Sequence, residues 1–129
     1  MRTSDCDKAV RLGRLSKAEQ FADAARTVRD LSAGDTDVAD AYVTLCVHAG
    51  IAAADVICCA RLARYSRGED HNEAVTLLGT VDATAAKHLR SLLDMKTRAG
   101  YSHTPASVEQ VKRAGRAMEA LLTLAHRVA

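Results

Sequence analysis

Apolar residues recur every three or four positions along most of the chain, which is the spacing of one face of an α-helix. Near the N-terminus, Ser4, Asp5 or Asp7 can cap a first helix. A capping box that begins at Ser16 can start another helix, and Gly34 can end it. We therefore expect two short helices or one bent helix in this segment. Its apolar face consists of Phe21, Ala24, Ala25, Val28 and Leu31.

The most apolar part of the chain predicts a long helix from about residue 37 to residue 65. Thr36 or Asp37 can cap its N-terminus. Its apolar positions cover nearly the whole circumference, so we expect this helix to be central and buried in protein. These positions are Val38, Tyr42, Leu45, Ala49, Ala52, Val56, Cys59 and Ala63.

Two further helices and a connector follow the central helix. Asn72 can cap a short helix that ends near Gly79. Asp82 can begin a longer helix that runs to about Arg98. After a connector over residues 99–105, we expect a final helix.

The final helix has a clear start, because a capping box begins at Ser107. No segment shows the alternation that is typical of a β-strand. The pattern therefore predicts an all-α bundle of four main helices plus short helices, without repeats. We expect one domain over residues 1–129, with an N-terminal helical segment (1–35) and a core bundle (37–128).

The composition agrees with this prediction and excludes some classes of protein. With 129 residues, the chain is too short for a multidomain enzyme. It has one Phe, three Tyr and no Trp, so its core must be aliphatic and rich in alanine. Alanine, leucine, arginine, lysine and glutamate favour helices, so an all-β fold is excluded.

The charge is uneven along the chain. Residues 1–81 carry 10 Lys/Arg and 12 Asp/Glu, whereas residues 82–129 carry 8 Lys/Arg and 4 Asp/Glu. This excess is small for a dedicated nucleic-acid binder, but it can steer an anionic ligand to the C-terminal third.

The four cysteines do not have the spacing of a zinc site, and no Gly-rich phosphate loop or HExxH motif occurs. We therefore expect no metal and no cofactor. We expect the cysteines to be buried, reduced thiols of a cytoplasmic protein. They are Cys6, Cys46, Cys58 and Cys59.

The stretch Ala41–Ala60 has the length of a membrane span, and only His48 and Asp55 in it are ionisable. An aspartate near the centre of a span is costly, and small residues dominate the stretch. We therefore expect a core helix and no membrane association.

The connector after Arg98 gathers residue types that suit cleavage of a phosphodiester bond. His103 follows Arg98 after four residues, with Lys96 just before and Tyr101 between them. Histidine can move a proton near neutral pH, and arginine can bind a phosphate and its developing charge. The alternative is a basic helix end that favours the helix dipole, followed by a solvated turn.

The run Arg98-Ala99-Gly100-Tyr101-Ser102-His103 resembles the signature of the HEPN family, which is an arginine and a histidine separated by four to six residues before the last helix. Residues 93–101 and 70–74 look like an actinobacterial branch of that family. The resemblance covers roughly residues 37–128.

The resemblance implies a homodimer in which two copies of the motif face each other. It implies a metal-independent endoribonuclease of the toxin or antiviral type, in which Arg98 binds the phosphate and His103 transfers the proton. A nucleotidyltransferase or antitoxin-like protein is an expected partner, besides RNA. The alternative is a non-catalytic HEPN binding module that holds a protein or a nucleotide-like anion. Ala99 favours this alternative, because HEPN nucleases commonly have Asn or Asp after the arginine.

Other residues are candidates for supporting roles in substrate binding. Asp55 lies in the most apolar helix and needs a partner, which can be Lys96, Arg98 or His103, or a purely structural one. His71 can contact the motif or be a passive residue at a helix cap. Tyr101 can stack on a base or close the end of the bundle.

Overall fold

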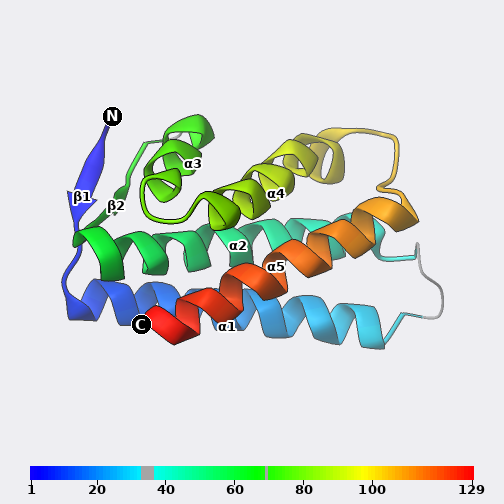
Figure 1. Cartoon of the computed structure of the whole chain (residues 1–129). Helices are drawn as coiled ribbons and strands as arrows, with labels where there is room; N and C mark the ends of the chain where they lie inside the picture. The colour runs from blue at the N-terminus through cyan, green and yellow to red at the C-terminus, as the bar shows by residue number, and fades with distance from the viewer. Residues whose placement is uncertain (33–36, 69) are drawn as a thin grey trace.

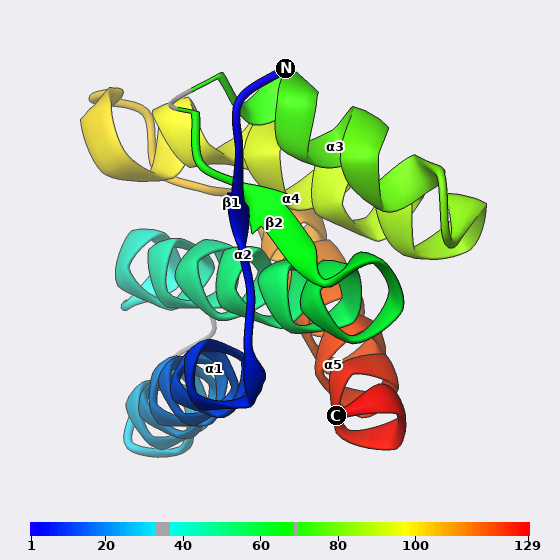
Figure 2. The same cartoon turned by 90° about the vertical axis from the view of Figure 1, so that its left-hand side faces the viewer.

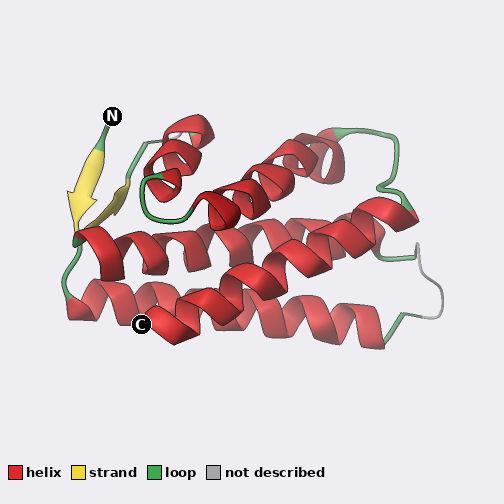
Figure 3. Ribbon diagram, in the orientation of Figure 1, coloured by secondary structure: helices red, strands yellow, loops and turns green. Residues whose placement is uncertain are grey.

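The computed structural model describes residues 1–32, 37–68 and 70–129 (Figure 1). These residues form an all-α bundle with a small sheet (Figure 3), so the predicted fold class is confirmed. The elements in chain order are β1 (Thr3–Asp5), α1 (Lys8–Asp30), α2 (Ala39–Leu62), β2 (Arg64–Ser66), α3 (His71–Gly79), α4 (Ala83–Tyr101) and α5 (Val108–Val128).

Of the two arrangements expected for the N-terminal segment, two short helices or one bent helix, the structure has a single helix, α1. The Asp7 side chain caps α1 by accepting a hydrogen bond of 2.9 Å from the Val10 amide. The helix continues through the capping box at Ser16, because its alanine face packs on the core without interruption. The buried residues of this face are Ala18, Ala22 and Ala25. The predicted end at Gly34 lies outside the described residues.

Helix α2 lies at the centre of the bundle. Figure 2 shows α1 on one side of it, α3 and α4 on another, and α5 beside it. Most of its residues are buried, which confirms the prediction of a central helix. In the described part of the chain, α2 is the one helix long and apolar enough to cross a membrane, and 67% of its most apolar window is buried inside the protein. This burial is the arrangement of a core helix.

The predicted ends of α2 need correction. The residue before its first turn is Val38, which makes no capping hydrogen bond, so Asp37 is not the cap. Thr36 lies outside the described residues. The helix stops at Leu62, three residues before the expected end, because Ala63 adopts the left-handed conformation with φ of 56°.

A two-stranded sheet contradicts the expectation that no strand would form. Strands β1 and β2 pair antiparallel, with Ser4 opposite Tyr65. Each strand has only three residues, so neither can show a detectable alternation. The sheet joins the N-terminus to the segment that leaves α2 (Figure 2).

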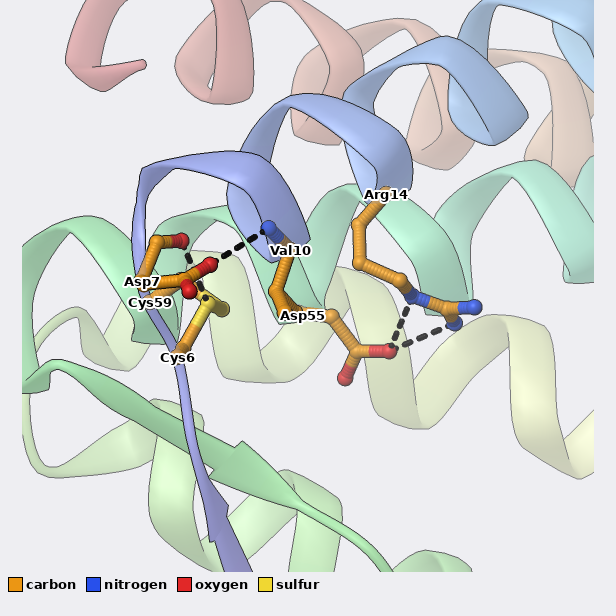
Figure 4. The surroundings of a disulfide bond; sticks show 6 residues. All are labelled: Cys6, Asp7, Val10, Arg14, Asp55 and Cys59. Carbon is orange, nitrogen blue, oxygen red and sulfur yellow. Dashed lines mark hydrogen bonds and ion pairs between the residues drawn. A yellow bond between two sulfur atoms is a disulfide. The ribbon is translucent and has the colours of Figure 1, made fainter.

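A disulfide between Cys6 and Cys59 continues this attachment (Figure 4). Their Cα atoms are 5.4 Å apart, a normal separation for a disulfide. The expectation of four reduced thiols is therefore wrong for these two residues. Cys46 and Cys58 are buried free cysteines, as expected. Pairing of β1 with β2 brings Cys6 to α2, and the cysteine spacing in the sequence could not reveal this.

The C-terminal helices begin largely where the sequence places them. Asp82 caps α4, and the capping box at Ser107 is formed in full, so both predictions are confirmed. Helix α3 is capped by Asp70 instead of Asn72. The Asp70 carboxylate accepts a hydrogen bond of 2.9 Å from the backbone amide of Asn72. Helix α4 continues beyond its expected end to Tyr101, so the first part of the expected connector is helical.

Two glycines within helices should respond oppositely to replacement by alanine. A Cβ atom at Gly50 of α2 would clash with Leu92 Cδ1, and both residues are buried. A Cβ atom at Gly13 of α1 would meet nothing within 4 Å. Gly13→Ala should raise the free energy of unfolding by roughly 0.5–1 kcal/mol through helix propensity. Gly50→Ala should lower it by about 1–2 kcal/mol, because overpacking outweighs the same gain. Urea denaturation of both variants tests this contrast, and a stabilised Gly50→Ala protein would contradict it.

Candidate functional site

The candidate motif lies at the end of the bundle where α4 turns into α5 (Figure 1). Arg98 lies in the last turn of α4, and His103 lies in the connector that follows. The connector is fixed to the N-terminal turn of α2, because the Ala106 amide donates a hydrogen bond of 2.8 Å to Asp40 Oδ1. The buried Ala106 side chain adds to this attachment. The bundle therefore positions both the end of α4 that carries Arg98 and the connector that carries His103.

The side chains of Arg98, Tyr101 and His103 are all exposed, and 82% of Tyr101 is open to solvent. Within the described residues, none of the three makes a side-chain hydrogen bond or ion pair. Tyr101 therefore does not close the end of the bundle. This exposed group of Arg98, Tyr101 and His103 is open to a large anionic ligand.

Lys96 faces a different neighbour. Its Nζ atom lies 2.7 Å from Nε2 of His71, the first residue of α3. Burial lowers the pKa of His71, and the nearby charge of Lys96 lowers it further. A neutral imidazole can accept a hydrogen bond from the ammonium group, so this contact is consistent with the lowered pKa. Positions 96 and 98 also point roughly 200° apart around a helix, so Lys96 does not support Arg98.

Asp55 pairs with Arg14 of α1, which corrects the expected pairing with Lys96, Arg98 or His103 (Figure 4). Its Oδ2 atom accepts hydrogen bonds from Arg14 Nε at 3.0 Å and from Arg14 Nη2 at 2.6 Å. Asp55 is 8% exposed. Burial raises the pKa of Asp55 to about 6, although Arg14 opposes this shift. The pair is a structural link between α1 and α2.

Arg14 was not a sequence candidate, although the pattern contained a signal for it. It precedes Ala18 by four residues, so it lies on the same face of α1 as the buried alanines. A cation at one end of a buried face is a natural partner for an aspartate in the neighbouring helix.

Asp55 and His71 line one small cavity between α2, α3 and α4, together with Cys58. Its volume is about 20 Å³, which suffices for a single water molecule. The predicted site residues thus form two sets. Arg98, Tyr101 and His103 are exposed at the end of the bundle. Asp55, His71 and Lys96 belong to internal contacts between helices.

In the described ranges, no three His, Cys, Asp or Glu side chains lie close enough to share a metal ion. The site as it stands offers a permanent cation, an imidazole and a phenol on one surface. This set can bind a phosphate and exchange a proton with a bound ligand.

Comparison of the chain with family models, with curated proteins and with solved structures finds no significant match.

Proposed function

We propose that the protein acts on RNA as a HEPN-type homodimer, in which Arg98 and His103 of both copies cleave a phosphodiester bond without a metal ion. The observation that carries this proposal is the exposure of both side chains, Arg98 in the last turn of α4 and His103 in the anchored connector, free of any ion pair in the described part of the chain. A phosphate can therefore reach Arg98 without displacing a protein carboxylate.

The reaction is an internal transfer that balances without a cofactor. One His103 accepts the proton of a ribose 2′-hydroxyl group, and the 2′-oxygen attacks phosphorus. The 5′-oxygen leaves with a proton from a second His103, which leaves a 2′,3′-cyclic phosphate. Arg98 binds the phosphate oxygens, on which negative charge develops.

The need for two proton-transfer groups supports a homodimer. Each copy offers one histidine in the connector, and no carboxylate is bonded to it within the described residues. A symmetric pair supplies both the base and the acid, and Arg98 of one copy can orient a phosphate for His103 of the other. The proposal includes a cytoplasmic location and control by a nucleotidyltransferase or antitoxin-like protein.

Incubation of the purified protein with total RNA and EDTA tests the proposal. The wild type should produce new ends that carry a cyclic or 3′-phosphate, because the 2′-oxygen is the nucleophile. His103→Ala and Arg98→Ala should abolish these ends. His126→Ala is the matched control, since this exposed histidine pairs with Glu19 away from the connector. Equal cleavage by His103→Ala would contradict the proposal.

The second candidate is a non-catalytic module that binds a nucleotide-like anion at the same connector. Ala99 favours it, because this apolar residue beside Arg98 is 9% exposed and offers no polar group. The contact between Lys96 and His71 favours it as well, because Lys96 then does not support Arg98. Under this candidate, the wild type leaves RNA intact but binds ATP, and Arg98→Ala loses the binding. Isothermal titration calorimetry separates the two candidates.

A further inference from the structure

Among the open grooves along helix α5, two are lined by several cations, and both are separate from Arg98 and the connector that follows α4. The first, which we name the α1–α5 groove, has a volume of about 410 Å³. Exposed cations of both helices line it, namely Arg29 from α1 and Lys112 and Arg116 from α5. Lys112 and Arg116 are one helical turn apart, so they lie on the same side of α5.

The wall of the α1–α5 groove is shaped by a close contact. A Cβ atom at Gly115 would lie 2.6 Å from the Tyr42 hydroxyl oxygen, so only glycine allows α5 to approach Tyr42 this closely. The guanidinium carbon of Arg29 lies 5.3 Å from the centre of the Tyr42 ring. This contact holds the Arg29 side chain over the aromatic face and leaves its charge available.

The second groove, which we name the α4–α5 groove, lies on the other side of α5 and has a volume of about 560 Å³. Lys87 and Arg90 of α4 and Arg113 of α5 line it. Arg90 donates a hydrogen bond of 2.6 Å to the neutral amide oxygen of Asn72, which leaves its charge uncompensated.

The two grooves together carry a clear excess of positive charge. Across the described residues, none of these six cations forms an ion pair with a carboxylate. Each groove contains one acidic residue. The acidic residue of the α1–α5 groove is Glu119, which already forms an ion pair with Arg26. The acidic residue of the α4–α5 groove is Asp94. The basic excess of residues 82–129 is thus concentrated on both sides of α5.

We infer that these grooves bind the phosphate backbone of a single-stranded RNA that crosses α5. Cations that are spread over α1, α4 and α5 match a long polyanion, because a single phosphate could contact only one groove. The exposed Tyr101 lies at the end of α4, near the start of α5, where it can stack on a base of the same strand. The inference rests on the proposed action on RNA for the identity of the ligand, and it assigns residues outside the Arg98–His103 motif.

Fluorescence anisotropy with a labelled 2′-O-methyl oligouridine tests this inference, because a strand without 2′-hydroxyl groups cannot be cleaved by the proposed reaction. Binding is measured between about 50 and 200 mM KCl. The full-length wild type is compared with Lys112→Gln/Arg116→Gln and with Arg90→Gln/Arg113→Gln. The matched control is Lys17→Gln/Arg127→Gln, which removes two exposed charges outside the grooves.

Each groove variant should bind roughly 25-fold more weakly near 0.1 M salt than the wild type, with a salt slope smaller by about 1.4, since each phosphate contact on a single strand contributes about 0.7. The control variant should keep the wild-type slope. Equal losses in the control and the groove variants, or a wild type that does not bind the strand, would overturn the inference. A wild type that binds this strand but does not cleave RNA contradicts the proposed cleavage only.

Discussion

Replacement of Cys6 and Cys59 together by alanine should lower the free energy of unfolding by about 4 kcal/mol. The disulfide joins residues 53 positions apart, so it removes much of the conformational freedom of the unfolded chain. Both cysteines are buried, so alanine introduces no polar atom into the core. Urea denaturation followed by circular dichroism measures the change. The denaturant slope should also rise, because the unfolded variant exposes more surface.

Reduction provides an independent control for this prediction. Dithiothreitol should destabilise the wild type by the same amount and leave the double alanine variant unchanged. Cys58→Ala, at a buried free cysteine beside Cys59, should retain the sensitivity to reduction. A wild type with four titratable thiols after purification without reductant would contradict the disulfide itself.

The disulfide also bears on where the protein works. Disulfides persist in oxidising compartments and are rare in the cytosol. The proposed cytoplasmic location therefore requires a fold that is stable without this bond. A protein that acts in the cytoplasm must stay folded when Cys6 and Cys59 are reduced, and the stability of the reduced wild type at 37 °C decides this point.

Arg14→Met should lower the free energy of unfolding by roughly 3 kcal/mol at pH 7, because it leaves the Asp55 carboxylate buried without a partner. This loss is at the low end for buried pairs, since the Arg14 side chain is 29% exposed. Near pH 4 the loss should be much smaller. Burial raises the pKa of Asp55 to about 6, so the folded protein already holds a neutral carboxyl group at that pH.

The pH dependence of the wild type follows from the same group. Asp55 binds its proton more tightly in the folded protein than in the unfolded chain, where the ordinary value of 3.8 applies. Its contribution to stability is therefore full below that value and is lost as the pH rises to about 6. Asp55→Asn should abolish this decline. In Arg14→Met the decline should extend above pH 6, because Arg14 holds the pKa of Asp55 down. Parallel pH profiles of all three proteins would contradict this account.

Features that depend on a few adjacent residues were predictable. The caps at Asp82 and Ser107 are local hydrogen bonds within one helical turn, so the sequence determines them almost alone. The apolar circumference of α2 likewise predicted its central place. Its N-terminal end was harder to predict, because Val38 precedes the first turn without a capping hydrogen bond from its side chain.

Features that join distant segments were not predictable from periodicity. The pairing of β1 with β2 and the disulfide depend on where the chain returns after α2. Lys96 and His71 were both candidate site residues, but the sequence did not predict that they contact each other. Only the packing of α3 on α4 brings them together. Asp55 was rightly expected to need a partner, but the sequence offered three other cationic candidates in the proposed site and gave no reason to prefer Arg14.

The central position of α2 has a consequence for any partly unfolded form of the protein. Helices α1, α4 and α5 all pack against α2, so loss of any one of them uncovers part of a 24-residue helix with the hydropathy of a membrane span. The exposed apolar surface of such an intermediate would favour binding to chaperones, to other copies of the chain and to lipid bilayers. Packing of the bundle around α2 therefore keeps this apolar surface out of contact with other molecules.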